Sequence, residues 1–127
     1  MKNNHNAIDL QHLNQYTGGD LELEQEIYGL FKEQVRIWLR LLIADGDKEG
    51  WASAAHSLKG SARGLGANSL ASACERAEAV IMSGSAERSV AAQDVRDKVD
   101  AVLHFINKRE YKLRIQSLRS SSQDSNS

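Results

Sequence analysis

Residues 51–67 read WASAAHSLKGSARGLGA, and the spacing of their apolar members decides the fold. These members recur at steps of three and four residues, which places them on one face of an α-helix. They are Trp51, Ala54, Ala55, Leu58, Ala62 and Leu65. The same period occurs over residues 23–43, 70–81 and 95–106, with short breaks rich in glycine, aspartate and serine between the stretches. The sequence therefore predicts an all-α protein, an antiparallel up-down four-helix bundle preceded by a short lead-in helix over residues 8–16.

The composition agrees with one soluble helical domain of 127 residues. Proline is absent, and the formal net charge of -1 gives no general reason to expect a nucleic acid or a membrane as partner. A single cysteine, Cys74, excludes an intramolecular disulfide and favours a reducing compartment. The polar start of the chain is not followed by an apolar run of signal-peptide or membrane-spanning length, so we expect a cytoplasmic protein.

Three segments are expected along the chain. Residues 1–7 are polar and are predicted to be a flexible N-terminus, and residues 8–115 are predicted to form the bundle domain. Residues 116–127 are rich in serine and have no apolar period, so we expect a disordered tail there.

His56 lies outside the apolar face of its predicted helix. At about 100° per residue, its side chain falls roughly 140° from that of Trp51, which argues against a buried structural histidine. Ala52 and Gly60 lie one turn to either side and leave the imidazole unobstructed, while Lys59 and Arg63 bring positive charge. A glycine inside a helix costs about 1 kcal/mol relative to alanine, a cost that packing alone does not explain here. A solvated surface histidine is the simplest alternative, but small neighbours admit a partner and cations admit an anion.

A neutral imidazole has a lone pair and can act as a nucleophile. Phosphoryl transfer needs mainly alignment and charge neutralisation, so an exposed histidine beside two cations is suited to carry a phosphoryl group.

The segment His56-x-Leu58-Lys59-Gly60-Ser61-Ala62-x-x-Leu65-Gly66-Ala67 resembles the motif of histidine-containing phosphotransfer (HPt) domains of phosphorelays. The resemblance implies that His56 accepts a phosphoryl group on Nε2 from the aspartate of a receiver domain and passes it to the aspartate of another. It also implies that Lys59 stabilises the phosphate and that Gly60 lets the receiver approach. Arg63 matches a variable position, and its supporting role follows only from its place on the helix.

The resemblance also implies the partners. These are receiver domains of a hybrid histidine kinase or of response regulators, and the Mg²⁺ ion is expected on the receiver, with no cofactor in this chain. Apolar groups around the histidine would form the docking surface, for which the candidates are Ala52 and, on the preceding helix, Ile37 and Leu39. We expect the protein to be a monomeric phosphocarrier and not an enzyme with its own ATP site.

Four other functions are alternatives to this interpretation. A self-phosphorylating kinase fragment requires an ATP-binding domain for which the chain leaves no room, and its glycines lack the Lys-Ser/Thr of a phosphate-binding loop. A non-catalytic helical adaptor that docks a receiver-like partner stays open. A metal site is disfavoured by the spacing of His5, His12 and His104. Nucleic-acid binding by the basic end of the last helix is a further alternative, but positive charge there is explained more simply by the helix dipole. The basic residues are Lys108, Arg109, Lys112, Arg114 and Arg119.

Overall fold

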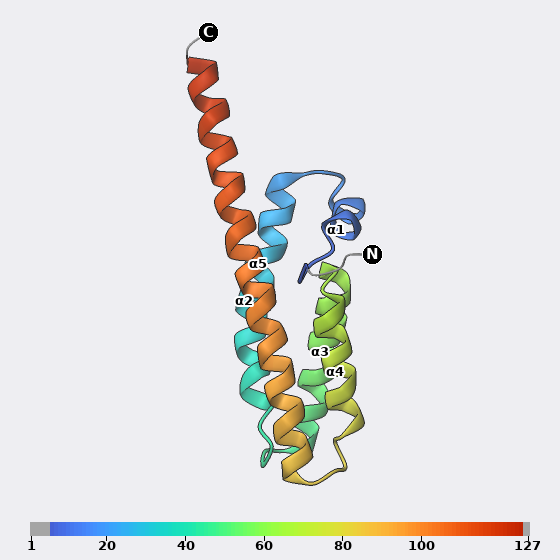
Figure 1. Ribbon diagram of the computed structural model, residues 1–127. Helices are drawn as coiled ribbons and strands as arrows, with labels where there is room; N and C mark the ends of the chain where they lie inside the picture. The colour runs from blue at the N-terminus through green and yellow to red at the C-terminus, as the bar shows by residue number, and fades with distance from the viewer. Residues whose placement is uncertain (1–5, 126–127) are drawn as a thin grey trace.

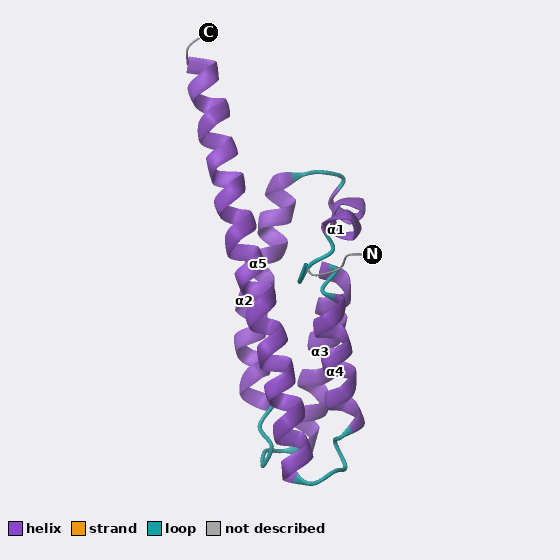
Figure 2. Ribbon diagram, viewed as in Figure 1, coloured by secondary structure: helices purple, strands orange, loops and turns teal. Residues whose placement is uncertain are grey.

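The computed structural model describes residues 6–125, and all regular structure within them is helical (Figures 1 and 2). Five helices follow one another along the chain: α1 (Leu10–Thr17), α2 (Leu21–Leu41), α3 (Lys48–Leu65), α4 (Asn68–Ala79) and α5 (Ser85–Ser125). The helices α2 to α5 alternate in direction, and α1 lies across one end of the bundle (Figure 1). The predicted fold class, a four-helix bundle with a short lead-in helix, is confirmed.

Aspartates begin three of these helices. The side chains of Asp9, Asp20 and Asp47 accept hydrogen bonds from the free backbone N–H groups in the first turns of α1, α2 and α3. At the other end of α3, Gly66 has φ 83°, and a Cβ atom there would lie 2.9 Å from the backbone oxygen of Asp9. Glycine is therefore required at Gly66 both for the left-handed turn and for the close approach of the segment before α1.

The core forms where the apolar faces of the four long helices meet. Each face is the one that the three- and four-residue period predicts, and α4 contributes mainly small residues, which allow its neighbours to approach closely. Its large, fully buried side chains include Trp51, Tyr28, Leu42, Leu58, Leu70 and Ile106.

The four helices α2 to α5 lie at the corners of a square around this core. Within the described residues, α3 lies next to α4 and α2, α5 also lies next to α4 and α2, and α3 and α5 face each other only across the core. Helix α3 is therefore diagonally opposite α5, and the outer surfaces of these two helices point away from each other.

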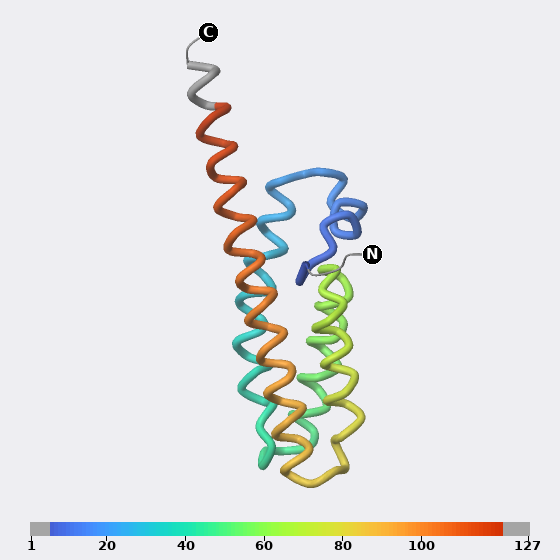
Figure 3. The backbone as a smooth tube through the Cα atoms, viewed as in Figure 1, coloured from blue at the N-terminus to red at the C-terminus, as the bar shows by residue number. Residues whose placement is uncertain are grey.

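Helix α5 differs from the sequence expectation. It continues to Ser125, well beyond the other helices (Figure 3), where a disordered tail was expected over residues 116–127. Neither glycine nor proline occurs after Gly84, so nothing stops a helix that is already formed. Leu113 also extends the packed region, because it is buried in the groove near Gln25 at the start of α2. The last two residues of the predicted tail, and residues 1–5 of the predicted flexible N-terminus, lie outside the described residues.

A buried ion pair joins α2 to α5 at this end of the bundle. Glu24 is 1% exposed and accepts hydrogen bonds from Nε and Nη2 of Arg109, at 2.7 and 3.1 Å, and from the hydroxyl of Tyr28. Burial by itself would raise the pKa of Glu24, but the hydrogen bonds from Arg109 and Tyr28 and the charge of Arg109 lower this pKa overall. The pair therefore holds an ionised carboxylate inside the fold.

Candidate functional site

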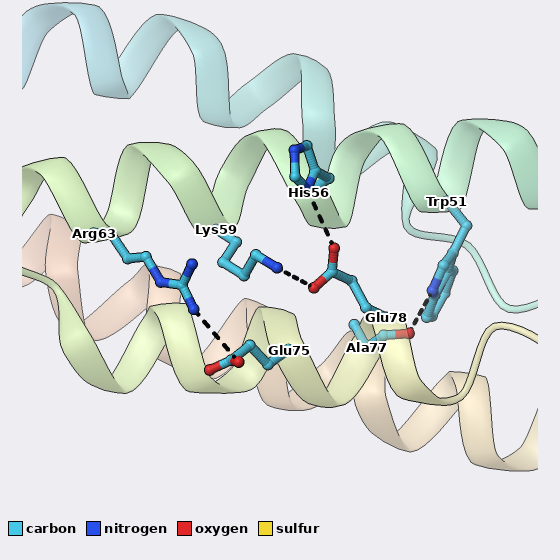
Figure 4. Close-up of polar contacts among 7 residues, drawn as sticks. All are labelled: Trp51, His56, Lys59, Arg63, Glu75, Ala77 and Glu78. Atoms are coloured by element: carbon cyan, nitrogen blue, oxygen red, sulfur yellow. Dashed lines mark hydrogen bonds and ion pairs between the residues drawn. The ribbon is translucent and has the colours of Figure 1, made fainter.

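Helix α3 presents His56 to solvent. The His56 side chain keeps 77% of its surface exposed, as its position outside the apolar face predicts. Five residues earlier, the buried indole of Trp51 donates a hydrogen bond of 2.8 Å to the backbone oxygen of Ala77 (Figure 4). This bond fixes α3 against α4 and so fixes the helix from which His56 projects.

Glu78 on α4 connects the two residues at the centre of the motif. Its Oε2 atom lies 3.4 Å from Nδ1 of His56, and its Oε1 atom accepts a hydrogen bond of 2.6 Å from Nζ of Lys59 (Figure 4). The hydrogen bond from Lys59, the strongest influence, and the weaker one from His56 lower the pKa of Glu78. The carboxylate is therefore ionised at neutral pH and faces the Nδ1 side of the imidazole.

Lys59 lies beside the histidine in a more enclosed position than the sequence suggested. Its side chain is only 16% exposed because its stem lies between α3 and α4 and its ammonium group reaches Glu78. In this arrangement the positive charge of Lys59 compensates the carboxylate directly. A phosphoryl group on His56 would meet a pair with no net charge and not a free lysine.

Gly60 leaves the surface next to His56 open. A Cβ atom built on Gly60 would meet no atom within 4 Å, so packing within this chain does not require a glycine. Ala52, one turn on the other side of His56, is half-buried and short. The side chains on either side of the imidazole along α3 are therefore short, which leaves room for a partner to dock closely.

The structure does not bring Arg63 to His56. The guanidinium of Arg63 lies 3.4 Å from Oε2 of Glu75 on α4, and both side chains are 55% exposed (Figure 4). The two positions on α3 are about 10 Å apart along the helix axis. Arg63 therefore repeats, further along α3, the kind of pairing that Lys59 makes with Glu78, and it belongs to the contact between α3 and α4.

Helix α2, which packs against α3, also carries exposed apolar side chains. Ile37 is 59% exposed and Leu30 is 55% exposed, whereas Leu39 is half-buried and packs against the core. Of the two candidates on this helix, only Ile37 lies on the exposed face.

Next to this face lies a shallow apolar hollow of about 220 Å³, between α1, α2 and α3. Tyr16, Leu30, Gln34, Ser61 and Gly64 contribute to its walls. Because α2 and α3 are antiparallel, Ile37 lies one turn nearer to His56 than Gln34 does.

Glu78 is the functional candidate that the sequence analysis missed. The sequence contains a signal for the position of Glu78, because Glu75 and Glu78 are three residues apart and therefore share one face of α4. The antiparallel pairing of α3 with α4 then sets Glu78 opposite Lys59 and Glu75 opposite Arg63. Lys59 and Arg63 are four residues apart, and this pair of cations fits the pair of carboxylates once α3 and α4 are known to pack antiparallel.

The described residues contain no group of three or more histidine, cysteine, aspartate or glutamate side chains that could hold a metal ion. His12 and His104 are exposed and lie on different helices, and His5 is outside the described residues. In the described part of the chain, no helix is both long enough and apolar enough to cross a membrane.

Comparison with known proteins agrees with this arrangement. Residues 18–120 match the family model described as the Hpt domain. The chain is also similar to the crystal structure of histidine phosphotransferase ShpA from Caulobacter crescentus, with 34% sequence identity over 88% of this chain and 98% of that chain, and a TM-score of 0.73. No curated protein matches. The matched model covers both the bundle and the segment around His56, and the chain therefore belongs to the Hpt domain family.

Proposed function

We propose that His56 accepts a phosphoryl group from the aspartyl phosphate of one receiver domain and transfers it to the aspartate of another. Membership of the Hpt family supports a role in phosphorelay signalling as a phosphocarrier. The observation that carries the specific proposal is the contact between His56 and Glu78, with the imidazole otherwise exposed.

This contact favours one ring nitrogen as the nucleophile. A carboxylate beside Nδ1 stabilises a proton on that nitrogen, which leaves the lone pair of a neutral ring on Nε2. Nε2 is on the side of the ring away from Glu78, toward solvent. Nε2 is therefore the atom that an aspartyl phosphate can approach in line.

In the proposed transfer step, one bond forms and one bond breaks at phosphorus. The Nε2 lone pair forms a bond to phosphorus as the phosphorus–oxygen bond to the receiver aspartate breaks, and the aspartate leaves as a carboxylate. The ring gains positive charge in this step, and Glu78 offsets it through the Nδ1 proton. Transfer to the second receiver is the same step reversed, with the carboxylate of that aspartate as nucleophile.

Lys59 has two parts in this proposal. Its ammonium group cancels the charge of Glu78, so that an incoming phosphoryl group does not approach an uncompensated carboxylate. Two N–H groups of the ammonium are also left to donate hydrogen bonds to the phosphoryl group once that group is on His56. This chain supplies the nucleophile, and the magnesium ion belongs to the receiver.

The open surface around Gly60 and Ile37 is proposed as the docking site for the receiver. A receiver must bring its aspartate within bonding distance of Nε2, which requires close contact between the two backbones near His56. The absence of a side chain at Gly60 permits that approach, and the exposed Ile37 provides apolar area to bury in the complex.

Transfer from a radiolabelled, phosphorylated receiver to the wild type and to His56→Gln tests the proposal. We expect label on the wild type only, with the acid lability and alkali stability of a phosphohistidine. Two-dimensional ¹H–¹⁵N NMR of the product should place the phosphoryl group on Nε2.

Three results would contradict the proposal. Equal labelling of both proteins would remove His56 as the acceptor. Binding of receivers without labelling, across all receivers of the same cell, would favour an adaptor. Labelling by ATP alone would show a kinase activity that a carrier does not have.

A further inference from the structure

The shallow apolar hollow between α1, α2 and α3 has no part in the proposed transfer step. Phe31 and Leu65 form its buried floor, while Tyr16 and Leu30 lie at its edge and are 73% and 55% exposed. Among the described residues that line the hollow, none is charged. The hollow therefore holds apolar surface that stays in contact with water in the free protein and is available to a partner.

Gly64 leaves one wall of the hollow without a side chain. It lies inside α3 and is exposed, and a Cβ atom built on it would meet no atom within 4 Å. Glycine weakens a helix relative to alanine, and packing within this chain does not require a glycine here. Contact with another molecule at this wall would account for it.

The hollow continues the surface that surrounds His56. Ala52, His56, Gly60 and Gly64 follow one another at four-residue steps and so form one row along α3. Ser61, which lines the hollow, directly follows Gly60 in the chain. The row of short residues beside the histidine therefore leads to the hollow.

A receiver docked at His56 reaches this far along α3. Gly64 is about 12 Å from His56 along the helix axis, and a circular interface of about 800 Å² on each partner extends roughly 16 Å from its centre. The opposite flank of His56, toward α4, carries the ion pair of Lys59 with Glu78 (Figure 4). Because charged residues are depleted in the cores of protein interfaces, the uncharged flank toward α2 is the one that favours contact.

We propose that the hollow selects between receivers by taking one bulky apolar side chain, aromatic or large aliphatic, from the receiver that docks at His56. The inference rests on the proposed function, because it needs a receiver at that site. A receiver with such a side chain buries apolar surface of both partners in the hollow, which stabilises its complex. A receiver with a charged side chain at the same point would bury that charge without a counter-charge, which weakens its complex.

Two walls of the hollow distinguish it from the parts of the surface that serve every receiver. Tyr16 belongs to α1, outside the residues 18–120 that match the family model. Gly64 stands at a position that the phosphotransfer motif leaves unspecified. Lys59 and Gly60, by contrast, lie within the motif and next to the histidine. The hollow is therefore placed to discriminate between receivers and not to take part in the chemistry.

Filling the hollow tests the proposal. Gly64→Leu adds a side chain at one wall, and transfer from each phosphorylated receiver of the same cell would be followed by rapid quench over a range of receiver concentrations. For the receiver that the wild type prefers, kcat/KM should fall at least about tenfold through a higher KM, as expected for the loss of one well-packed anchor side chain. For the other receivers it should change by less than about twofold, so that the preference narrows. Leu30→Ser, which removes the opposite wall on α2, should have the same effect on the same receiver.

Gly29→Leu and Leu21→Ser are the matched controls. They make the same two exchanges at exposed sites on α2 that lie outside the described lining of the hollow, and their kcat/KM should equal that of the wild type for every receiver. Circular dichroism establishes that each variant is folded. Labelling of His56 by potassium phosphoramidate, which needs no receiver, should be equal in all five proteins, which separates docking from the reactivity of the histidine.

Three results would overturn the selection. A folded Gly64→Leu variant with wild-type kinetics would show that no receiver side chain enters the hollow, and an equal loss for every receiver would make the hollow a general contact. Dimerisation of the wild type that Gly64→Leu abolishes in sedimentation would assign the hollow to a second copy of this chain. Failure of the proposed function is distinct from these results, because the wild type would then accept phosphate from none of the receivers while phosphoramidate still labels His56.

Discussion

The carboxylate of Glu78 contacts both His56 and Lys59, with its two oxygens divided between them: 3.4 Å from Oε2 to Nδ1 of His56, and 2.6 Å from Oε1 to Nζ of Lys59. One acidic side chain on α4 therefore orients the proposed nucleophile and neutralises the neighbouring cation at the same time. The relationship also explains why Lys59 is 16% exposed on an otherwise open surface.

Replacing Glu78 with alanine should slow the acceptance of phosphate by about tenfold, equivalent to about 1.4 kcal/mol in the activation free energy. The variant loses the group that holds the proton on Nδ1 and offsets the charge gained by the ring. Rapid-quench transfer kinetics give the rate, and ¹⁵N chemical shifts of His56 report the population of the two tautomers. Glu75→Ala is the control because it removes the partner of Arg63 and leaves His56 untouched. If the two variants were slowed equally, the effect would be one of α3–α4 packing and not of tautomer selection.

Gly60→Gln should stabilise the isolated protein and yet slow the transfer. A residue with a Cβ atom improves helix propensity by up to about 1 kcal/mol, and a Cβ atom at Gly60 meets nothing within 4 Å. The longer side chain, however, would occupy the space that the receiver needs beside His56. Gly29→Gln on α2 is the matched control, since a Cβ atom there also meets nothing. Thermal denaturation should show a similar gain for both variants, and only Gly60→Gln should lower the transfer rate; unchanged transfer in that variant would rule out the clearance role.

Ile37→Ser should weaken receiver docking with little effect on the fold. Ile37 is 59% exposed, so its removal sacrifices little buried area in the free protein but loses apolar contact in the complex. We expect the receiver concentration at half-maximal rate to rise several-fold, about 1 kcal/mol in binding free energy, while the rate at saturation stays the same. Leu39→Ser provides the contrast, because Leu39 packs against the core and its loss should lower the free energy of unfolding by about 1–2 kcal/mol. A reduced saturating rate in Ile37→Ser would instead place Ile37 in the transfer step.

The period of the apolar residues was sufficient to predict the helices and their buried faces. Trp51, Leu58 and Leu65 recur on one side of α3, and no competing strand pattern exists, so local spacing alone fixed both the helix and the outward position of His56. The same reasoning could not predict Glu78 as a partner of His56, because that contact depends on how α4 is aligned beside α3. Packing of two helices, and not the periodicity of either one, sets this register.

The end of α5 shows a second limit of the sequence pattern. The serine-rich composition after residue 115 predicted disorder, but composition does not record that Leu113 packs beside the start of α2 or that the preceding turns are already helical. The Glu24–Arg109 pair also supports this region from inside, and its partners are far apart in the sequence. Long-range contacts of this kind favour helix where local composition alone does not.

Glu24→Gln should destabilise the protein in a way that depends on pH. The exchange keeps the shape of a side chain that is 1% exposed but removes the charge that Arg109 requires, and we expect a loss of about 2 kcal/mol in the free energy of unfolding at pH 7. Because the folded state lowers the pKa of Glu24 below its usual 4.5, this carboxylate stabilises the fold above about pH 4.5, and the contribution disappears as the pH falls through the lowered pKa. The difference between wild type and variant should therefore shrink as the pH falls below about 4.5 in urea titrations. Glu26→Gln, an exposed neighbour on α2, should change stability by less than about 0.5 kcal/mol throughout. A difference for Glu24→Gln that stayed constant from neutral to acid pH would show that the charge of Glu24 does not contribute to stability, and that only its shape does.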